Sequence, residues 1–212
     1  LLLYDRFDIR EYSLENKVIA KKLTNVREYQ LMFRQPKLNN LNPSVPTSKL
    51  RVIELTNDVV LKVMTIDENK SGYVCLNLNK DLKMRSIVFE PKLISTLLKA
   101  KNTDYYTYLR EDFNEPPTLV MKKGKAPSKT IFKSNPQHDH YGWGSYKLIE
   151  YKNSKGIALK GALFYPFNYD PQQQYPMIVN IYQKKSKELH EYTNPSLLNG
   201  AVFNRTYFTS QG

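Results

Sequence analysis

Histidine and aspartate, which bind metals or transfer protons, stand side by side only once in this sequence. Two histidines flank an aspartate in His138-Asp139-His140. If the segment is extended, the two imidazoles share a face and could hold a metal ion. No third or fourth ligand stands out, and His190 lies in another region. We therefore expect a solvated loop at 138–140, with no metal bound there.

The sequence also lacks the motif that surrounds the nucleophilic serine in many hydrolases. The chain has thirteen serines, and none lies at the centre of the G-x-S-x-G turn that exposes a nucleophilic serine. The nearest pattern, Gly142-Trp143-Gly144-Ser145, places its serine after the second glycine. With no such serine to activate, the histidines are poor candidates for a catalytic triad. We expect the chain by itself not to hydrolyse peptides.

The acidic residues near Arg110 are the next candidates for chemistry. They are Asp104, Glu111, Asp112 and Glu115. Glycoside hydrolysis needs two carboxylates on opposite sides of a sugar, and spacing in the sequence does not establish that. We therefore interpret the group as a surface with salt bridges. The chain also lacks a glycine-rich phosphate loop, so we expect no nucleotide or other cofactor.

Composition limits the partners of the protein. The 212 residues carry a net charge of +12, but the lysines are spread along the chain, which favours a solvated cationic surface over a nucleic-acid site. Cys75 is the only cysteine, so an intramolecular disulfide is excluded, and its alternating neighbours predict a buried strand position. No apolar run is long enough to span a membrane and no signal peptide is visible. The sequence does not choose between periplasm and cytoplasm.

The first two thirds of the chain predict a mainly β structure. Short runs that alternate apolar and polar residues are separated by turn residues, as in strands with one buried face. These runs lie at 7–14, 30–33, 50–55, 59–66, 73–78, 86–89, 105–109, 118–121 and 130–132. Such spacing is typical of a sandwich, a barrel or propeller blades. Segment 90–99 differs, because Leu93, Ile94, Leu97 and Leu98 would share one face of a helix; an extended linker is the alternative.

Near residue 140 the pattern changes. Strands at 146–151 and 157–165 are joined by Asn153-Ser154-Lys155-Gly156, which predicts a hairpin. The apolar run 177–182 predicts a strand buried on both faces. Asn194 and Pro195 then predict the start of a helix that ends at Gly212. Since one buried strand cannot complete a parallel sheet, we expect a piece of a longer protein.

Residues 148–166 and their continuation to 179 resemble the opening hairpin of the peptidase domain in the prolyl oligopeptidase family, which includes dipeptidyl peptidases and acylaminoacyl peptidases. The segments 4–9, 22–24, 105–111 and 116–119 are similar to later blades of the propeller in that family. The resemblance implies late β-propeller blades at 1–140 and the first, incomplete part of an α/β-hydrolase domain at 141–212. It implies a Ser/Asp/His triad beyond the end of this chain.

One catalytic residue follows from the resemblance. In the family, the strand equivalent to 177–181 ends in a glycine-rich turn or in a tyrosine that donates to the oxyanion of the tetrahedral intermediate. Tyr182 matches the tyrosine version, although Gln183-Lys184-Lys185-Ser186 replaces the usual small turn. Such a donor stabilises the charge that develops in the transition state. The alternative is a tyrosine at a strand end that only packs its ring.

Two hypotheses about function thus stand. The first is part of a serine peptidase that acts on oligopeptides, with open strand edges through which the chain self-associates. The second is a non-catalytic β-rich module that binds peptide, glycan or polyanion through its aromatic and lysine side chains. Cooperative unfolding of the chain alone and salt-dependent binding to an acidic polymer would favour the second.

Overall fold

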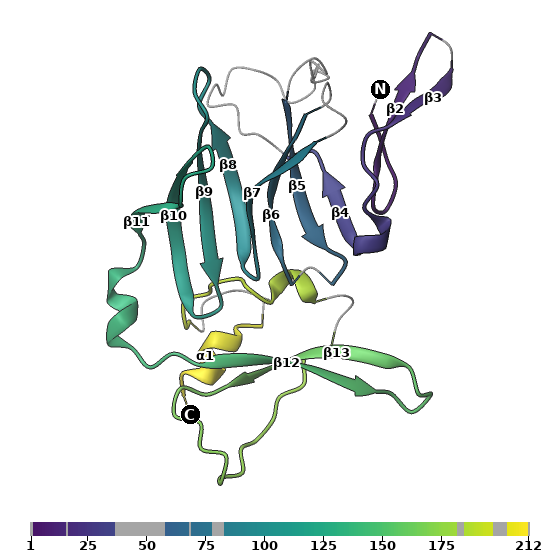
Figure 1. Cartoon of the computed structure of the whole chain (residues 1–212). Coiled ribbons are helices and arrows are strands. Elements are labelled where there is room, and N and C mark those ends of the chain that lie inside the picture. Colours follow the sequence, from purple (N-terminus) through teal and green to yellow (C-terminus); the bar gives the residue numbers. More distant parts are fainter. Residues whose placement is uncertain are drawn as a thin grey trace. The chain divides into compact units, whose positions relative to one another are not determined.

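The computed structural model describes residues 2–15, 17–36, 58–67, 69–77, 83–181, 185–196 and 203–211. Their contacts divide the chain into two compact units. Unit 1 comprises Leu1–Arg110 and Leu119–Phe132, and unit 2 comprises Glu111–Thr118 and Lys133–Gly212. The described residues are mainly β, as predicted, and all the strand pairs of known register are antiparallel (Figure 1).

Three antiparallel sheets follow one another along the chain, and they belong to unit 1 except for the part of the third sheet that lies in residues 111–118 and at residue 133. The first sheet contains β1 (Leu2–Tyr4), β2 (Ile9–Ser13) and β3 (Val18–Lys22). After the 3₁₀ helix η1 (Arg27–Tyr29), the second contains β4 (Leu31–Arg34), β5 (Asp58–Thr65), β6 (Ser71–Asn77) and β7 (Met84–Glu90). The third contains β8 (Leu93–Lys99), β9 (Tyr105–Asp112), β10 (Glu115–Lys123) and β11 (Lys129–Lys133). Within each sheet, strands adjacent in sequence are also adjacent in space.

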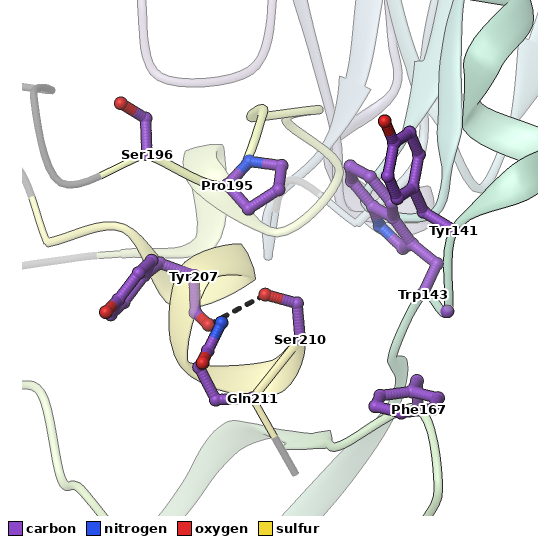
Figure 2. A pocket seen from close by; sticks show the side chains of 9 residues that line it. Tyr141, Trp143, Phe167, Pro195, Ser196, Tyr207, Ser210 and Gln211 are labelled. Carbon is purple, nitrogen blue, oxygen red and sulfur yellow. Dashed lines mark hydrogen bonds between the residues drawn. The ribbon is translucent and has the colours of Figure 1, made fainter.

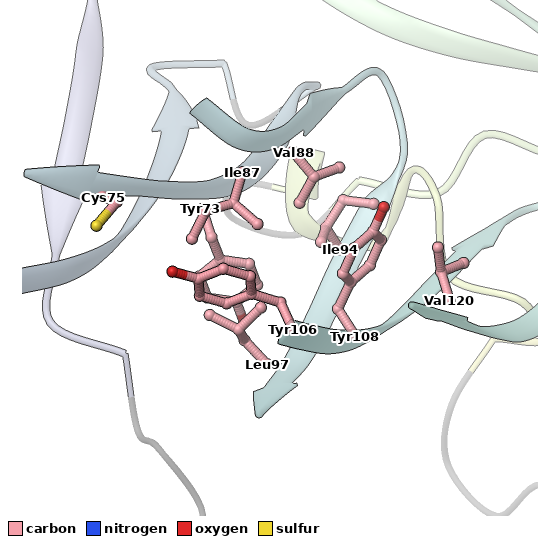
Figure 3. Close-up of a cluster of buried hydrophobic side chains, with 9 residues drawn as sticks. All are labelled: Tyr73, Cys75, Ile87, Val88, Ile94, Leu97, Tyr106, Tyr108 and Val120. Atoms are coloured by element: carbon pink, nitrogen blue, oxygen red, sulfur yellow. The ribbon is translucent and has the colours of Figure 1, made fainter. Parts of the chain in front are cut away.

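Strand β6 explains how the three sheets pack. Successive side chains of a strand point to opposite faces. Val74 and Leu76 belong to an apolar cluster shared with the first sheet, which contributes Ile9. Tyr73 and Cys75 belong to a second cluster, to which the third sheet contributes a group of buried side chains (Figure 3). That group is Ile94, Leu97, Tyr106, Tyr108 and Val120. The second sheet is therefore buried on both faces.

Most strand predictions for unit 1 are confirmed. Strands β2, β4 to β7 and β9 to β11 overlap the predicted runs, whereas the run at 50–55 lies outside the described residues. Cys75 is buried in β6, as expected. The prediction missed β1 and β3, which are three and five residues long.

Most of segment 90–99 is strand β8, Leu93–Lys99, so the prediction of a helix or a linker is wrong. Strand β8 buries Ile94 and Leu97, which are three positions apart. Thr96 between them has φ of 51°, in the left-handed region that few β-branched residues adopt. The conformation of Thr96 interrupts the alternation of inward and outward side chains along β8. Ile94 and Leu97 therefore both face the core, although three positions is a helical spacing.

Unit 2 contains one hairpin and three short helices among its described residues. These are η2 (Pro136–His140), β12 (Ser145–Lys152), β13 (Ala158–Tyr165), η3 (Ser186–Glu188) and α1 (Arg205–Thr209). Strands β12 and β13 pair antiparallel from Ser145↔Tyr165 to Lys152↔Ala158, which confirms the predicted hairpin. In its turn, the Asn153 side chain accepts hydrogen bonds from two backbone amides, and Gly156 supplies a φ of +74°.

The buried strand predicted at 177–182 is wrong for its described part. Residues 176–181 form no strand, and Met177, Val179 and Ile181 are 72%, 64% and 85% exposed. In the described part of unit 2, β12 and β13 pair only with each other. An apolar run becomes a buried strand only beside neighbours that accept its backbone hydrogen bonds, and this segment is bonded to no described strand.

The C-terminal helix is shorter than predicted. Asn194 and Pro195 lie in irregular structure, and α1 covers only Arg205–Thr209. The capping residue is Asn204, whose side chain accepts a hydrogen bond from the Tyr207 amide. The predicted end at Gly212 lies outside the described residues. None of the described helices is long and apolar enough to cross a lipid bilayer.

Candidate functional site

The tip of the β9–β10 hairpin supplies the most buried acid of unit 2. Asp112 is 8% exposed, and its Oδ1 accepts a hydrogen bond from the Phe113 amide at 2.8 Å. The same oxygen lies 2.8 Å from Nδ1 of His190, which is 4% exposed. An ionised carboxylate only accepts hydrogen bonds, so Nδ1 of His190 carries the proton in this contact.

The half-buried Tyr146 of β12 completes this polar cluster. Its hydroxyl donates to Oδ2 of Asp112 at 3.4 Å and lies 3.1 Å from Nδ1 of His190. Burial, followed by the negative charge of Asp112, raises the pKa of Tyr146 far above its ordinary range. Tyr146 therefore stays a neutral donor at physiological pH. We call Asp112, Tyr146 and His190 the buried triad.

Asp112 and His190 are hydrogen-bonded to each other like the aspartate and histidine of a serine hydrolase, but a substrate cannot reach them. An aspartate that binds Nδ1 of a histidine fixes the tautomer used in serine hydrolases. At 4% exposure, however, the His190 ring cannot be reached by a substrate from solvent. We interpret these contacts as structural. They tie three segments together, since Asp112 and His190 are 78 positions apart in the sequence.

Arg205 of α1 packs beside this triad. Its guanidinium lies over the rings of Phe164 and Phe113, at 4.9 and 5.6 Å from their centroids. It also donates to the main-chain oxygens of Glu188 and, at 2.9 Å, of Glu191. Burial lowers the pKa of Arg205, although the neighbouring carboxylates, first that of Glu191, raise it.

The 138–140 motif packs against aromatic rings. Residues 136–140 form η2, so the extended geometry that would align two imidazoles is not adopted. The His138 ring lies 4.4 Å from that of Trp143, and its Nδ1 lies 3.2 Å from the Tyr192 hydroxyl. Trp143 stacks on Tyr192 with centroids 4.9 Å apart, and its Nε1 donates to the Phe113 carbonyl at 2.8 Å. In the described part of the chain, no three potential metal-ligating side chains lie together.

Both positions beside Trp143 require glycine, because other atoms lie too close to the backbone there for a Cβ. A Cβ on Gly144 would lie 2.3 Å from the Tyr165 carbonyl oxygen, and one on Gly142 would lie 2.4 Å from the Phe167 ring. Real Cβ atoms do not come so near other heavy atoms. The Gly-Trp-Gly sequence thus lets this segment lie against the hairpin, a role unrelated to a nucleophile turn.

Trp143 also lines a hollow of about 600 Å³ (Figure 2). Four of its nine lining residues are aromatic, and none of the nine carries a charge. They are Tyr141, Gly142, Trp143, Phe167, Pro195, Ser196, Tyr207, Ser210 and Gln211. Tyr141 and Phe167 are 66% and 50% exposed. Aromatic faces and uncharged polar groups of this kind suit a neutral ligand with a ring or an apolar face.

The predicted acidic surface group is separated by the fold. In unit 1, Asp104 pairs with Arg85 at 3.3 Å and Arg110 pairs with Glu90 at 3.8 Å, as expected of salt bridges. In unit 2, Asp112 is buried in the triad, which the sequence did not indicate. Burial and the charge of Glu191 raise the pKa of Glu111.

Tyr182, the predicted oxyanion donor, lies outside the described residues, so its role stays a prediction. The buried triad was missed by sequence reasoning. Its members come from three distant segments and follow no motif, so no local signal could have found them. The one usable hint was Trp143 between two glycines, which marks a tightly packed position.

Comparison with known proteins bears on the fold. No protein family and no curated protein matches the sequence. Among solved structures, a candidate dipeptidyl aminopeptidase IV from Bacteroides ovatus matches 74% of this chain with a TM-score of 0.51 and 16% identity. The AtxE2 isopeptidase matches 58% with a TM-score of 0.46 and 17% identity. The chain spans only 20% and 19% of those two proteins. At 16% identity, the likeness to the Bacteroides protein is one of fold.

Proposed function

We propose that the chain is part of a serine peptidase of the prolyl oligopeptidase type that cleaves oligopeptides. In this proposal residues 1–140 form late blades of a β-propeller, and residues 141–212 form the first part of an α/β-hydrolase domain. The observation that carries it is the fold that 74% of the chain shares with the candidate dipeptidyl aminopeptidase IV. The chain spans a fifth of that protein, so most of a peptidase would lie in other parts of the polypeptide.

The arrangement of unit 1 supports the propeller part of the proposal. Propeller blades are four-stranded antiparallel sheets that pack face to face in chain order. The second and third sheets each have four strands in sequential order, and apolar clusters join each sheet to the next. Such blades would restrict entry to the active site and help to position peptides.

The chemistry assigned to this chain is oxyanion stabilisation by Tyr182. In acyl transfer, the serine attacks the peptide carbonyl and negative charge develops on its oxygen. A phenol held near that oxygen stabilises the charge more in the transition state than in the substrate, and thereby raises kcat. Serine, acid and histidine would come from elsewhere in the polypeptide.

Active-site labelling tests the proposal. We expect a fluorophosphonate probe to label the complete natural gene product, and that product to hydrolyse oligopeptides. The 212-residue chain alone should not be labelled. In the complete protein, Tyr182→Phe should lower kcat about 100-fold with little change in KM, while the control Tyr151→Phe, at a half-exposed position, should not. A complete protein without a reactive serine would refute the peptidase, and an unchanged kcat would refute the role of Tyr182.

The aromatic hollow favours a second candidate, a module that binds peptide or glycan without catalysis. Its uncharged lining fits stacking against a proline or sugar ring. Trp143 is the only tryptophan in the sequence, so its fluorescence reports on the hollow. Quenching by a proline-rich peptide or an oligosaccharide, together with a monomer that unfolds cooperatively, would favour this candidate. Self-association in a light-scattering dilution series would favour the first.

A further inference from the structure

Strand β11 is an open sheet edge with an unusual set of side chains. It lies at the end of the third sheet, so it has a described strand on one side only. All five of its residues are exposed, including Ile131 at 50% and Phe132 at 62%. An open edge presents unpaired backbone N–H and C=O groups that can pair with another strand.

The chain segment that contains this edge is basic and has no acidic residue of its own. Residues 116–138 contain five lysines and no aspartate or glutamate. Two of these lysines, Lys129 and Lys133, lie at the ends of β11. Since alternate residues of a strand share a face, Lys129, Ile131 and Lys133 lie on the same face. The edge thus presents an apolar residue between two cations.

This pattern opposes pairing with a second copy of the chain. In an antiparallel pair of β11 strands centred on Ile131, Lys129 of each copy would face Lys133 of the other. Like charges directly opposite each other destabilise a strand pair. A strand with acids at those two positions would instead be stabilised by opposite charges, and an apolar residue between them would cover Ile131.

We propose that the edge of β11 binds an extended acidic segment of a partner protein as an added antiparallel strand. The segment would carry the pattern acid–x–apolar–x–acid, with its acids opposite Lys129 and Lys133. Backbone hydrogen bonds hold the added strand, and the side chains select it, as in other cases of strand addition. This inference does not depend on the peptidase proposal.

A labelled peptide tests the proposal on the 212-residue chain. The probe is fluorescein-labelled Thr-Glu-Thr-Val-Thr-Glu-Thr, followed by fluorescence anisotropy. We expect saturable binding that weakens as salt is added, and no binding of the peptide with lysines in place of its glutamates. Hydrogen exchange should show slower exchange of β11 amides in the complex. Absence of saturable binding would overturn the proposal.

Two charge-reversal variants locate the site. K129E/K133E should bind about tenfold more weakly, because two attractive pairs become repulsive. K152E/K155E changes exposed lysines of the β12–β13 hairpin and lowers the net charge of +12 by the same four units, yet should bind as the wild type does. Equal weakening of both variants would show attraction to the overall charge and overturn the proposal.

A backbone-modified peptide separates strand addition from charge attraction. The same sequence with methyl groups on alternate backbone nitrogens keeps both glutamates but loses donors needed for pairing. We expect no saturable binding of this peptide. Binding equal to that of the unmodified probe would overturn the added-strand geometry.

Discussion

The two units bury their interiors in different ways. In unit 1, alternating residues of long strands fill two apolar clusters, and the middle sheet is covered on both faces. In unit 2, the strands of the hairpin are largely exposed, and the interior is made by aromatic rings, the half-buried Arg205 and the buried triad. Unit 1 thus depends on many similar contacts, whereas unit 2 depends on a few specific ones.

This difference implies different sensitivity to mutation. An apolar cluster loses stability in proportion to the volume removed. A buried polar cluster loses most when one member is removed, because the remaining groups stay buried without partners. The four predictions below test this contrast.

Removing a large core side chain from unit 1 should have the largest effect. Phe33 is fully buried in the first apolar cluster, and Phe33→Ala should lower the free energy of unfolding by about 4 kcal/mol. Hydrogen exchange resolved by segment should show the loss in β4 to β7. Phe132→Ala, the same change at a side chain that is 62% exposed, is the control. A similar loss in both variants would contradict the apolar core as the source of stability.

Removing one member of the buried triad should have the second largest effect on stability. Asp112→Ala leaves the buried His190 and the half-buried Tyr146 without their acid, and should lower the stability of unit 2 by about 3 kcal/mol. Urea unfolding followed by Trp143 fluorescence measures it, with the exposed Asp139→Ala as control.

A double-mutant cycle sharpens this result. Asp112→Leu with His190→Phe should cost less than the sum of the single variants, because each single variant already removes the contact between Asp112 and His190, which the double variant loses only once. Strict additivity would mean that the two side chains do not stabilise unit 2 as a pair.

Adding a side chain at Gly144, where the backbone lies close to the hairpin, should lower stability moderately. The Cβ of Gly144→Ala would meet the Tyr165 carbonyl oxygen, so the backbone must shift, at a cost of about 2 kcal/mol. Thermal unfolding monitored at Trp143 measures the change. Gly161→Ala, whose Cβ would have an ordinary contact of 3.4 Å with Ile149, should change stability far less. Equal stability of the two variants would refute the packing role of Gly144.

The smallest effect concerns the half-buried acid Glu111. Its pKa is raised by burial and by Glu191, so the ionised form destabilises the folded state at neutral pH. Glu111→Gln should therefore stabilise unit 2 by about 0.5 kcal/mol at pH 7, allowing for solvent screening. The difference should shrink as the pH falls toward 4.5, because the folded protein then protonates Glu111 itself. A difference that grows on acidification would have the wrong sign.

The sequence determined the strands with clear alternation and their turns. The β12–β13 hairpin follows from two alternating runs and from Asn153 and Gly156, whose preferences act within a few residues. Most strands of unit 1 and the burial of Cys75 follow in the same way. These features depend on local backbone preference and on the two-residue period of strands, and both can be read from the sequence.

Tertiary structure decided the features that local pattern indicated wrongly or not at all. Thr96 interrupts the two-residue period of β8, so that buried residues of this strand are three positions apart, a spacing typical of a helix. The apolar residues 177–181 form no strand, since pairing needs a neighbour that the run itself cannot supply. The buried triad joins Asp112 to His190 across 78 positions, because burial and hydrogen bonding depend on which segments meet in space.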